Sequence, residues 1–558
     1  MHHYHLQIDL IVRQSMSNKE IADQFELMAK LLELHEENTF RSKNYSLAYL
    51  SLKKVAIPFS KMDMNSLAAL PHVGVQNAKK AISAAQVGVL EGLQGLIDKT
   101  PEGILDILKI KGLGPKKVGQ IWRELNITNL GQLRYACEEN RLVSLNGFGI
   151  KIQNDVKEKI DFIWANKGKF LYHQAVTLAH QLLEQLEANL PNFKWLLTGE
   201  IRRCVTEISS IQILTTCNEV IDAAETIDQL IFENNSFSYR HFPVEFIVTS
   251  DAQLAITLFK STGSSLFLDT IDIPEKSFAT EADIFTSLGL HFVPPEARDQ
   301  VNASKYFDLN LPTPQLINDK DIKGIVHCHS TYSDGLDPLK NMAEYISSCG
   351  YEYMVITDHS KSATYANGLT EERVFEQWAE IEQLNEEHGD HFTIFRGIES
   401  DILSDGSLDY TDEILKRFDV VIASIHSGMD MNIEKATTRI IKAIENPHTR
   451  ILGHPTGRLL LSRAGYPVHM SKIIDACAAN NVVIELNCNP QRLDIDWSFI
   501  QECIQKNVLI ALNPDAHSKE AISNVQYGVI AARKGLLSAH QCLNNFSTLE
   551  FRNWIQSR

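Results

Sequence analysis

Seven short apolar runs between residues 322 and 519 constrain the fold of this chain more than any other feature. They are residues 322–327, 353–357, 393–398, 419–424, 450–453, 482–487 and 508–513. Stretches with helical periodicity lie between most of these runs, for example residues 339–349, 371–387 and 432–445. A repeated unit of strand, loop and helix is typical of parallel strands joined by right-handed crossovers. The pattern therefore predicts a parallel α/β barrel.

Residues able to bind a metal follow six of the seven runs. They are His327, His329 and Asp334 after the first run, Asp358 and His359 after the second, Glu399 after the third, His426 after the fourth, His454 after the fifth, and Asp515 and His517 after the seventh. No obvious ligand follows the sixth run. In such barrels, the loops after the strands meet at one mouth, where the chemistry takes place.

This crowding of acids and histidines predicts a multinuclear metal site. A single histidine after a strand is more often an ordinary hydrogen-bonded residue than a ligand. A large group of them is costly to bury unless cations compensate the carboxylates. Imidazole and carboxylate ligands without thiolate suit Zn, Mn or Fe.

The motifs around these residues resemble those of the PHP (polymerase and histidinol phosphatase) family. The matching stretches are His327-Cys-His329-Ser-Thr-Tyr-Ser-Asp334-Gly, Ile356-Thr-Asp358-His359-Ser, Gly397-Ile-Glu399, Ala423-Ser-Ile-His426-Ser, Gly453-His454-Pro-Thr-Gly-Arg458 and Asp515-Ala-His517-Ser. The resemblance implies a distorted (β/α)7 barrel that binds two to three Zn, Mn or Fe ions and hydrolyses phosphoesters. Clustered ions of this kind activate a water and stabilise a leaving oxygen.

The resemblance also assigns roles to single residues. It implies that the metal ligands are His327, His329, Asp334, His359, Glu399, His426, His454, Asp515 and His517. Asp358 is expected to support the ligands from behind, and Arg458 is expected to hold a substrate phosphate. Asp515 and His517 are also candidates for proton transfer, and the sequence does not separate that role from metal binding.

The region up to about residue 170 has helical patterns and three stretches that resemble helix-hairpin-helix elements. Their key residues are Gly74 in the first, Gly112, Gly114, Lys116 and Lys117 in the second, and Gly147, Gly149 and Lys151 in the third. Glycine lets a backbone approach closely, and the free N–H groups at a helix start can bind a phosphate oxygen. We therefore expect sequence-independent contacts with the DNA backbone.

Residues 171–315 have the pattern of a mixed α/β domain. Residues 193–197, 208–215 and 244–249 are expected strands, and residues 174–188 an expected helix. The stretch Gly199-Glu200-Ile-Arg202-Arg203 resembles the signature of family X DNA polymerases. The order of the regions is similar to that of bacterial PolX proteins, in which this polymerase core precedes a PHP domain.

The polymerase carboxylates depart from the family pattern. Ser210 and Gln212 replace the Asp-x-Asp pair, Glu245 stands at the third carboxylate position, and Glu200 replaces a serine. Two-metal catalysis needs anionic oxygens, so we predict no significant polymerase activity. Arg202 and Arg203 are expected either to bind DNA phosphate or to pair with Glu200 and Glu207.

Together these patterns predict five regions. They are a tail (1–16), an N-terminal helical domain (17–95), a fingers-like helix-hairpin-helix domain (96–170), an α+β palm and thumb domain (171–315) and the PHP domain (316–558). The net charge of −17 argues against a nucleic-acid partner, but residues 101–170 carry twelve Lys and Arg against eight Asp and Glu.

Composition also indicates where the chain works. The nine cysteines include no Cys-x-x-Cys pair, which is typical of a reduced, cytoplasmic protein. We expect no signal peptide and no membrane segment, because no apolar run reaches roughly 18 residues. A monomer is the default expectation.

The preferred function is that of a PolX-like DNA repair protein whose PHP domain is a metal-dependent phosphodiesterase. The resemblance implies a 3′-5′ exonuclease, with abasic-site endonuclease and 3′-phosphatase as further activities, acting on primer ends, gaps or abasic sites. Three alternatives stay open at this point: a phosphatase of small phosphate monoesters, a non-catalytic DNA-binding scaffold, and a polymerase that still works through Glu245 and other carboxylates.

Overall fold

The computed structural model describes residues 17–55, 57–165, 168–274, 276–300 and 303–557. The expected tail, residues 1–16, lies outside the described residues. The chain forms two compact units, Met1–Leu133 and Arg134–Arg558. The break between them falls inside the region 96–170 that the sequence suggested as one domain. Every helix among the described residues is too short or too polar to cross a membrane.

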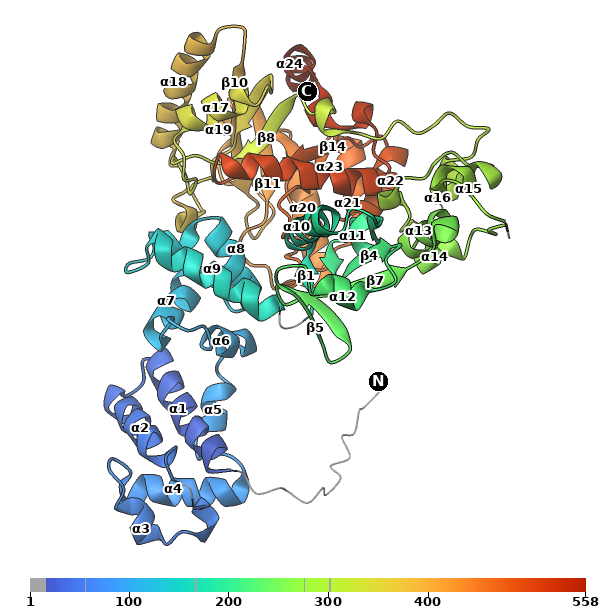
Figure 1. Cartoon of the computed structure of the whole chain (residues 1–558). Helices are drawn as coiled ribbons and strands as arrows, with labels where there is room; N and C mark the ends of the chain where they lie inside the picture. The colour runs from blue at the N-terminus through green and yellow to red at the C-terminus, as the bar shows by residue number, and fades with distance from the viewer. Residues whose placement is uncertain (1–16, 56, 166–167, 275, 301–302, 558) are drawn as a thin grey trace. The chain divides into compact units, whose positions relative to one another are not determined.

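The first unit is helical, as predicted. Its described α-helices are α1 (Asn18–Leu34), α2 (Thr39–Leu52), α3 (Met64–Ala68), α4 (Gly74–Val87), α5 (Leu93–Ile97), α6 (Glu102–Ile107) and α7 (Pro115–Leu125) (Figure 1). Helix α1 begins with a capping box in which Ser17 and Glu20 satisfy each other's backbone N–H groups. Its buried face carries Ile21, Phe25 and Met28, which form the centre of this unit.

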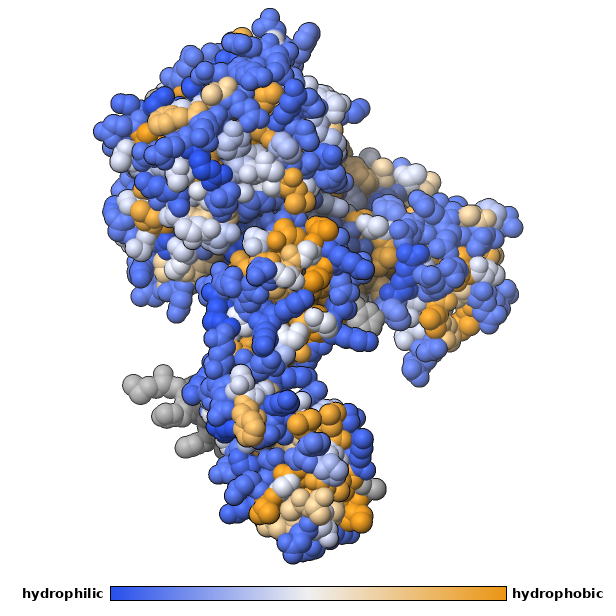
Figure 2. Space-filling model, turned by 90° about the vertical axis from the view of Figure 1, so that its left-hand side faces the viewer, coloured by the Kyte–Doolittle hydropathy of each residue, from blue (hydrophilic) through white to orange (hydrophobic). Residues whose placement is uncertain are grey.

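Some apolar side chains of the helical unit remain in contact with solvent. Figure 2 shows hydrophobic patches on its surface, and the exposed residues include Phe40, Leu50, Ile57 and Val75. Scattered apolar residues are common on protein surfaces. These four residues lie outside the buried core of the unit.

The predicted hairpins lie between α3 and α4, between α6 and α7, and before α9 (Ile150–Ala165). Gly112 and Gly147 have φ angles of 100° and 81°, which only glycine adopts easily. His72 occupies the corresponding place in the first hairpin with a φ of 62°. The three turns therefore share a positive φ at this position, where the first tolerates a side chain. They differ two residues later, because Gly74 has a φ of 61° and Gly114 a φ of −75°.

Helices α8 (Leu130–Glu138) and α9 lead into a mixed domain. Its five-stranded sheet has the order β2-β4-β7-β6-β5, and α10 (Tyr172–Asn189) packs against β2. The strands are β2 (Trp195–Thr198), β4 (Ile211–Thr215), β5 (Leu230–Glu233), β6 (Ser236–Tyr239) and β7 (Phe242–Val248). The predicted strand 208–215 is divided, because β3 (Glu207–Ile208) pairs instead with β1 (Phe170–Leu171).

The C-terminal region is the predicted seven-stranded parallel sheet. Its order is β14-β13-β12-β11-β10-β9-β8, and the strands are β8 (Gly324–Cys328), β9 (Tyr353–Ile356), β10 (Thr393–Asp401), β11 (Val420–Ser424), β12 (Thr449–Leu452), β13 (Val483–Asn487) and β14 (Ile510–Asn513). A parallel bridge between Cys328 and Ala516 joins the two edges. The prediction of a distorted barrel is confirmed.

Helices surround this sheet, as the alternating pattern predicted. They include α17 (Leu339–Ser348), α18 (Glu371–His388), α20 (Ile433–Ile444), α21 (Met470–Asn480) and α23 (Val525–Lys534) (Figure 1). Their buried faces and the outward side chains of the strands form one continuous core. Because parallel strands point the same way, every strand delivers its C-terminal end to the same mouth.

The last helix packs against the inner core of the barrel. Phe551 of α24 (Thr548–Gln556) is fully buried and lies 4.5 Å from the ring of Tyr353 and 5.0 Å from that of Phe395, measured between centroids. Val326, Val355 and other strand residues belong to the same cluster. Aromatic rings of this size bury a large apolar area.

We predict that Phe551→Ala lowers the unfolding free energy of the PHP domain by about 3–5 kcal/mol, since it removes a buried aromatic ring. Differential scanning calorimetry should record a lower melting temperature for that transition. Leu549→Ala is the matched control, because Leu549 lies on the same helix and is 68 % exposed. Equal melting temperatures for the two variants would contradict the role given to Phe551.

Candidate metal centre

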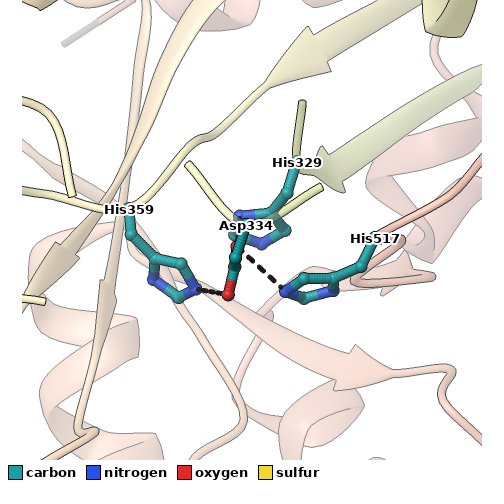
Figure 3. Close-up of side chains that lie close together, drawn as sticks. All are labelled: His329, Asp334, His359 and His517. Carbon is teal, nitrogen blue, oxygen red and sulfur yellow. Dashed lines mark ion pairs between the residues drawn. The ribbon is translucent and has the colours of Figure 1, made fainter. Parts of the chain in front are cut away.

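The nine ligands that the sequence predicted come together at the mouth of the barrel. They lie on or directly after strands β8, β9, β10, β11, β12 and β14, and each of these side chains is at most 10 % exposed. Figure 3 shows His329, His359 and His517 around Asp334. Residues up to 190 positions apart in the sequence therefore share one buried site.

Three groups of these residues offer atoms close enough to bind an ion. The groups are His329, Asp334, His359 and His517; His327, His329 and Asp515; and His359, Glu399 and His426. Within each group, one ligand atom per residue lies within 4.8 Å of all the others. His329 and His359 each belong to two groups, so the three positions adjoin one another.

Glu399 lies at the centre of the cluster. Its carboxylate is 3.0 Å from His454 Nε2 and 3.0 Å from His359 Nδ1. It is also 3.2 Å from His426 Nε2 and 3.3 Å from His327 Nε2. Because one carboxylate approaches four imidazoles, it would help these histidines to hold the ions.

The cluster leaves many buried ligand atoms without a hydrogen-bond partner. These atoms are His327 Nε2, His329 Nδ1, Asp334 Oδ2, His359 Nδ1, Glu399 Oε2, His454 Nδ1 and His517 Nε2. Buried polar atoms are normally paired, and each unpaired one costs free energy. Divalent ions coordinated by these atoms would remove that cost. The residues present therefore fit a metal centre, and we conclude that the PHP domain binds divalent metal.

The electrostatics of the cluster point the same way. Burial lowers the pKa of His426, but the carboxylates of Glu399 and Asp401 outweigh burial and raise it to about 10. Burial likewise lowers the pKa of His517, while Asp334 raises it to about 10 overall. The buried carboxylates are thus stabilised by positive charge nearby. A divalent ion supplies that charge in place of protons.

The backbone leaves its regular path where three ligands begin. His327, His454 and Asp515 have φ angles of 66°, 21° and 50°, values that are costly for residues other than glycine. At His327 the pairing of β8 with β9 also shifts its register. The surrounding sheet therefore holds these residues in conformations that turn them toward the mouth.

Two carboxylates that position the ligands were missed by the sequence analysis. Glu485 Oε2 on β13 is 2.6 Å from His327 Nδ1, and its Oε1 accepts a hydrogen bond from the backbone N–H of His454 (3.1 Å). Asp401 Oδ1 on β10 is 2.7 Å from His426 Nδ1. Each contact holds a ring so that Nε2 faces the cluster. The signal was a carboxylate inside or just beyond an apolar run.

Asp358 supports the site from behind, although it touches none of the predicted ligand histidines through a hydrogen bond among the described residues. Its carboxylate accepts hydrogen bonds from the N–H and hydroxyl of Ser330 (both 2.8 Å), from Ser333 and from the Gln377 amide (2.6 Å). The loop that carries Asp334 is therefore held by Asp358. Asp358 acts on loop geometry rather than on the histidine rings.

Arg458 makes three hydrogen bonds within the protein. Its Nη1 donates to Asp496 (2.6 Å), its Nε donates to the carbonyl of Arg492 (2.8 Å), and its Nη2 donates to the carbonyl of Leu493. With these donors used, Arg458 ties the loop after β12 to the loop after β13. The phosphate-binding role assigned from the motif match stays a prediction.

The carboxylates of the polymerase-like site form hydrogen bonds with neighbouring groups of the protein. Ser210 Oγ donates to one oxygen of Glu245 and Gln212 Nε2 donates to the other, both at 2.8 Å. Glu200 accepts a hydrogen bond from the backbone N–H of Ser209 (2.7 Å). These contacts satisfy the carboxylates without an ion.

The arginines of the polymerase-like signature form internal ion pairs. Arg202 binds both oxygens of Glu281 (3.0 and 2.7 Å), and Arg203 donates to Asp299 (2.8 Å). These partners are not Glu200 and Glu207, the ones that the sequence analysis considered. Both arginines brace the mixed domain in this structure.

The predicted DNA-binding residues of the hairpins lie at the surface. Gly74, Gly112, Gly114, Gly147, Gly149, Lys116 and Lys151 are exposed, and Lys117 is half-buried. The backbone at each hairpin is thus accessible to a nucleic-acid strand. Their contacts with DNA stay a prediction.

The fold and the site define a PHP-domain phosphoesterase joined to helix-hairpin-helix and polymerase-like regions. Residues 16–90 match the model of a helix-hairpin-helix domain, and residues 326–489 match the model of the PHP domain. Over 95 % of its length the chain is 31 % identical to the DNA polymerase/3′-5′ exonuclease PolX of Bacillus subtilis, of which it covers 97 %. The chain belongs to the PolX family.

The PHP region also has separate relatives. It is 33 % identical to a probable phosphatase of Clostridium acetobutylicum over 24 % of this chain and 55 % of that protein. It is 28 % identical to a probable phosphatase of Acetivibrio thermocellus over 34 % of this chain and 78 % of that protein. These relatives agree with a hydrolase that acts on phosphoesters.

We predict that Glu485→Gln lowers the affinity for Mn²⁺ or Zn²⁺ by about 10- to 100-fold, because residues that orient a metal-binding histidine have effects of this size. Isothermal titration calorimetry on the metal-depleted protein measures the change. Glu386→Gln, on the exposed side of α18, serves as the matched control. Unchanged affinity in Glu485→Gln would contradict the positioning role.

Proposed function

We propose that this PolX-family protein is a metal-dependent 3′-5′ exonuclease of DNA and that its polymerase-like site no longer incorporates nucleotides. The observation that carries the proposal is the contrast between the two sites. The PHP cluster keeps a full set of ligands with unpaired atoms. The polymerase-like carboxylate Glu245 is instead bonded to neutral Ser210 and Gln212.

The three groups of ligands support two to three ions, and the absence of thiolate among them favours Zn, Mn or Fe. When bound, such ions supply an activated water and stabilise the charge on phosphate oxygens. The protein's own contribution is to fix the ligands. Asn487 donates to Asp515 Oδ2 (2.9 Å), and His517 Nδ1 contacts the Asp515 carbonyl (3.0 Å). This arrangement leaves His517 Nε2 facing the site.

His517 and Asp515 are the candidates for proton transfer in this proposal. His517 stacks against the ring of His329, with 4.2 Å between centroids, and lies 3.4 Å from Asp334. Both residues also line a cavity that opens beside the cluster. They are therefore the ligands nearest to a substrate that enters from that side.

The remaining regions give the exonuclease its substrate. In the proposal, residues 17–95 and 96–170 hold DNA through the hairpin residues Gly74, Gly112, Gly114, Gly147 and Gly149 and the neighbouring lysines. Residues 171–315 keep a polymerase-like framework, and residues 316–558 cut the strand. Abasic-site endonuclease and 3′-phosphatase activities are further proposals that rest on the PolX resemblance.

Hydrolysis of small phosphate monoesters is a second candidate. It is favoured by the similarity of the PHP region to the probable phosphatases. It leaves the first 315 residues without a role in the reaction. Activity on DNA compared with activity on p-nitrophenyl phosphate separates the two candidates.

We predict that wild type shortens a 5′-labelled recessed primer in Mn²⁺ and that His327→Ala/His329→Ala lowers the rate by more than about 100-fold, because two groups of ligands are disrupted. Denaturing electrophoresis follows the primer. His180→Ala/His391→Ala, at two exposed positions, is the control and should shorten the primer normally. If the His327→Ala/His329→Ala variant shortens the primer at the wild-type rate, the proposal is wrong.

We also predict that the His327→Ala/His329→Ala variant does not lengthen the same primer when all four deoxynucleoside triphosphates are present. This background is chosen because exonuclease activity would otherwise mask extension. The reason is that Ser210 and Gln212 carry no negative charge for metal ions. Extension that disappears in an added Glu245→Gln substitution would refute the loss of polymerase activity.

A further inference from the structure

The helical segment at the start of the second unit shares a cavity with the metal centre. The cavity lies between the start of α9 and the residues that follow β14, and its volume is about 340 Å³. Asp515 and His517 line one side, and Ile150, Gln153 and Asn154 of α9 line another. Pockets for small ligands have volumes of roughly 300–1,000 Å³. The cluster therefore opens onto a space large enough for one chemical group of a substrate.

The lining of this cavity suits a neutral group rather than a second phosphate. Its hydrogen-bonding residues include Asn140, Gln153, Asn154, Asn489, Ser518 and Asn524, together with the carboxylates of Glu138, Glu139 and Glu520. Lys157 is the one Lys or Arg among the described lining residues, and it is paired with Glu138. Carboxylates repel anions. A phosphoester whose phosphate lies at the metal centre would therefore extend its uncharged part into the cavity.

One atom in the wall is left without a partner. Gln153 is only 2 % exposed, and its Nε2 donates to Asn140 Oδ1 at 2.9 Å. Its Oε1 is buried and has no hydrogen bond. A buried acceptor without a donor costs free energy, and a ligand N–H or O–H would remove this cost.

We propose that the cavity binds the nucleoside of the terminal nucleotide while the adjoining phosphate lies at the metal centre. The inference rests on the proposed exonuclease function and adds a substrate subsite to it. Gln153 Oε1 accepts a hydrogen bond from an N–H group of the base. Ile150, which is 53 % exposed at the start of α9, offers an apolar contact to the base.

In this proposal the third hairpin also places the end of the DNA strand near the cavity. Gly147 and Gly149 lie just before α9, so the hairpin that is expected to contact DNA backbone adjoins the cavity wall. A strand bound at the hairpin is thereby close to the site that receives its terminal nucleoside. Selection for a nucleotide over a plain phosphoester then comes from residues outside the barrel.

The test compares the binding of 2′-deoxyadenosine 5′-monophosphate and 2-deoxyribose 5-phosphate to the full-length, Mn²⁺-loaded protein by calorimetry. Wild type should bind the nucleotide about tenfold or more tightly, because the base adds contacts and a hydrogen bond. Ile150→Trp should bring the two affinities within about twofold, because the larger ring fills the cavity. Leu549→Trp, at an exposed position on α24, should keep the preference.

A second variant tests the contribution of the Gln153 hydrogen bond separately from that of the cavity volume. Gln153→Leu should reduce the nucleotide preference by about 3- to 10-fold and leave the affinity for deoxyribose phosphate unchanged. Equal binding of the two ligands by wild type, or a preference that survives Ile150→Trp, would overturn the subsite. If wild type prefers the nucleotide but never shortens DNA, the proposed exonuclease fails and the nucleoside subsite stands.

Discussion

The attraction between one buried carboxylate and four imidazoles is the interaction on which the rest of this structure depends. Glu399 is 1 % exposed and has four histidine nitrogens within 3.3 Å. Burying so many ionisable groups is unfavourable unless positive charge is added. The barrel brings the strand ends, and with them the four histidines, close to Glu399. Bound metal ions would supply the positive charge.

The two carboxylate sites of the chain differ in how their polar atoms are paired. In the barrel, acceptors and imidazole nitrogens are buried without partners, so the folded protein is incomplete until ions bind. In the polymerase-like sheet, Ser210 and Gln212 hold both oxygens of Glu245. A carboxylate satisfied by neutral neighbours gains little from an ion. The five-stranded sheet forms with Ser210 and Gln212 in place of the two aspartates expected from the family pattern.

The second unit also connects its helical start with the barrel. Arg492, in the loop after β13, is buried and its Nε donates to the hydroxyl of Tyr135 on α8 (2.7 Å). Arg141 stacks over Tyr365, 4.4 Å from the ring centroid. These contacts hold α8 and α9 at the mouth. The sixth strand, which supplies no predicted ligand, contributes Glu485 and this arginine-bearing loop.

The sequence by itself indicated most strands and the candidate ligands, because both are local properties of a parallel barrel. Apolar runs mark strands, and a residue just past a strand end must face the mouth, so His359 and His517 could be found without coordinates. Gly112 and Gly147 were recognisable for a similar reason, since their turns have a positive φ that favours glycine. The missing polymerase aspartates were equally readable.

Only the tertiary structure decided the partners. Glu485 lies 158 positions from the histidine that it orients, and Arg458 is held by residues of the next loop. Arg202 pairs with Glu281, which lies 79 positions away in the sequence. The cavity beside Asp515 needs α9 as its second wall. These pairings depend on how the closed barrel and the mixed domain meet, and no local pattern in a sequence encodes a distance of that kind.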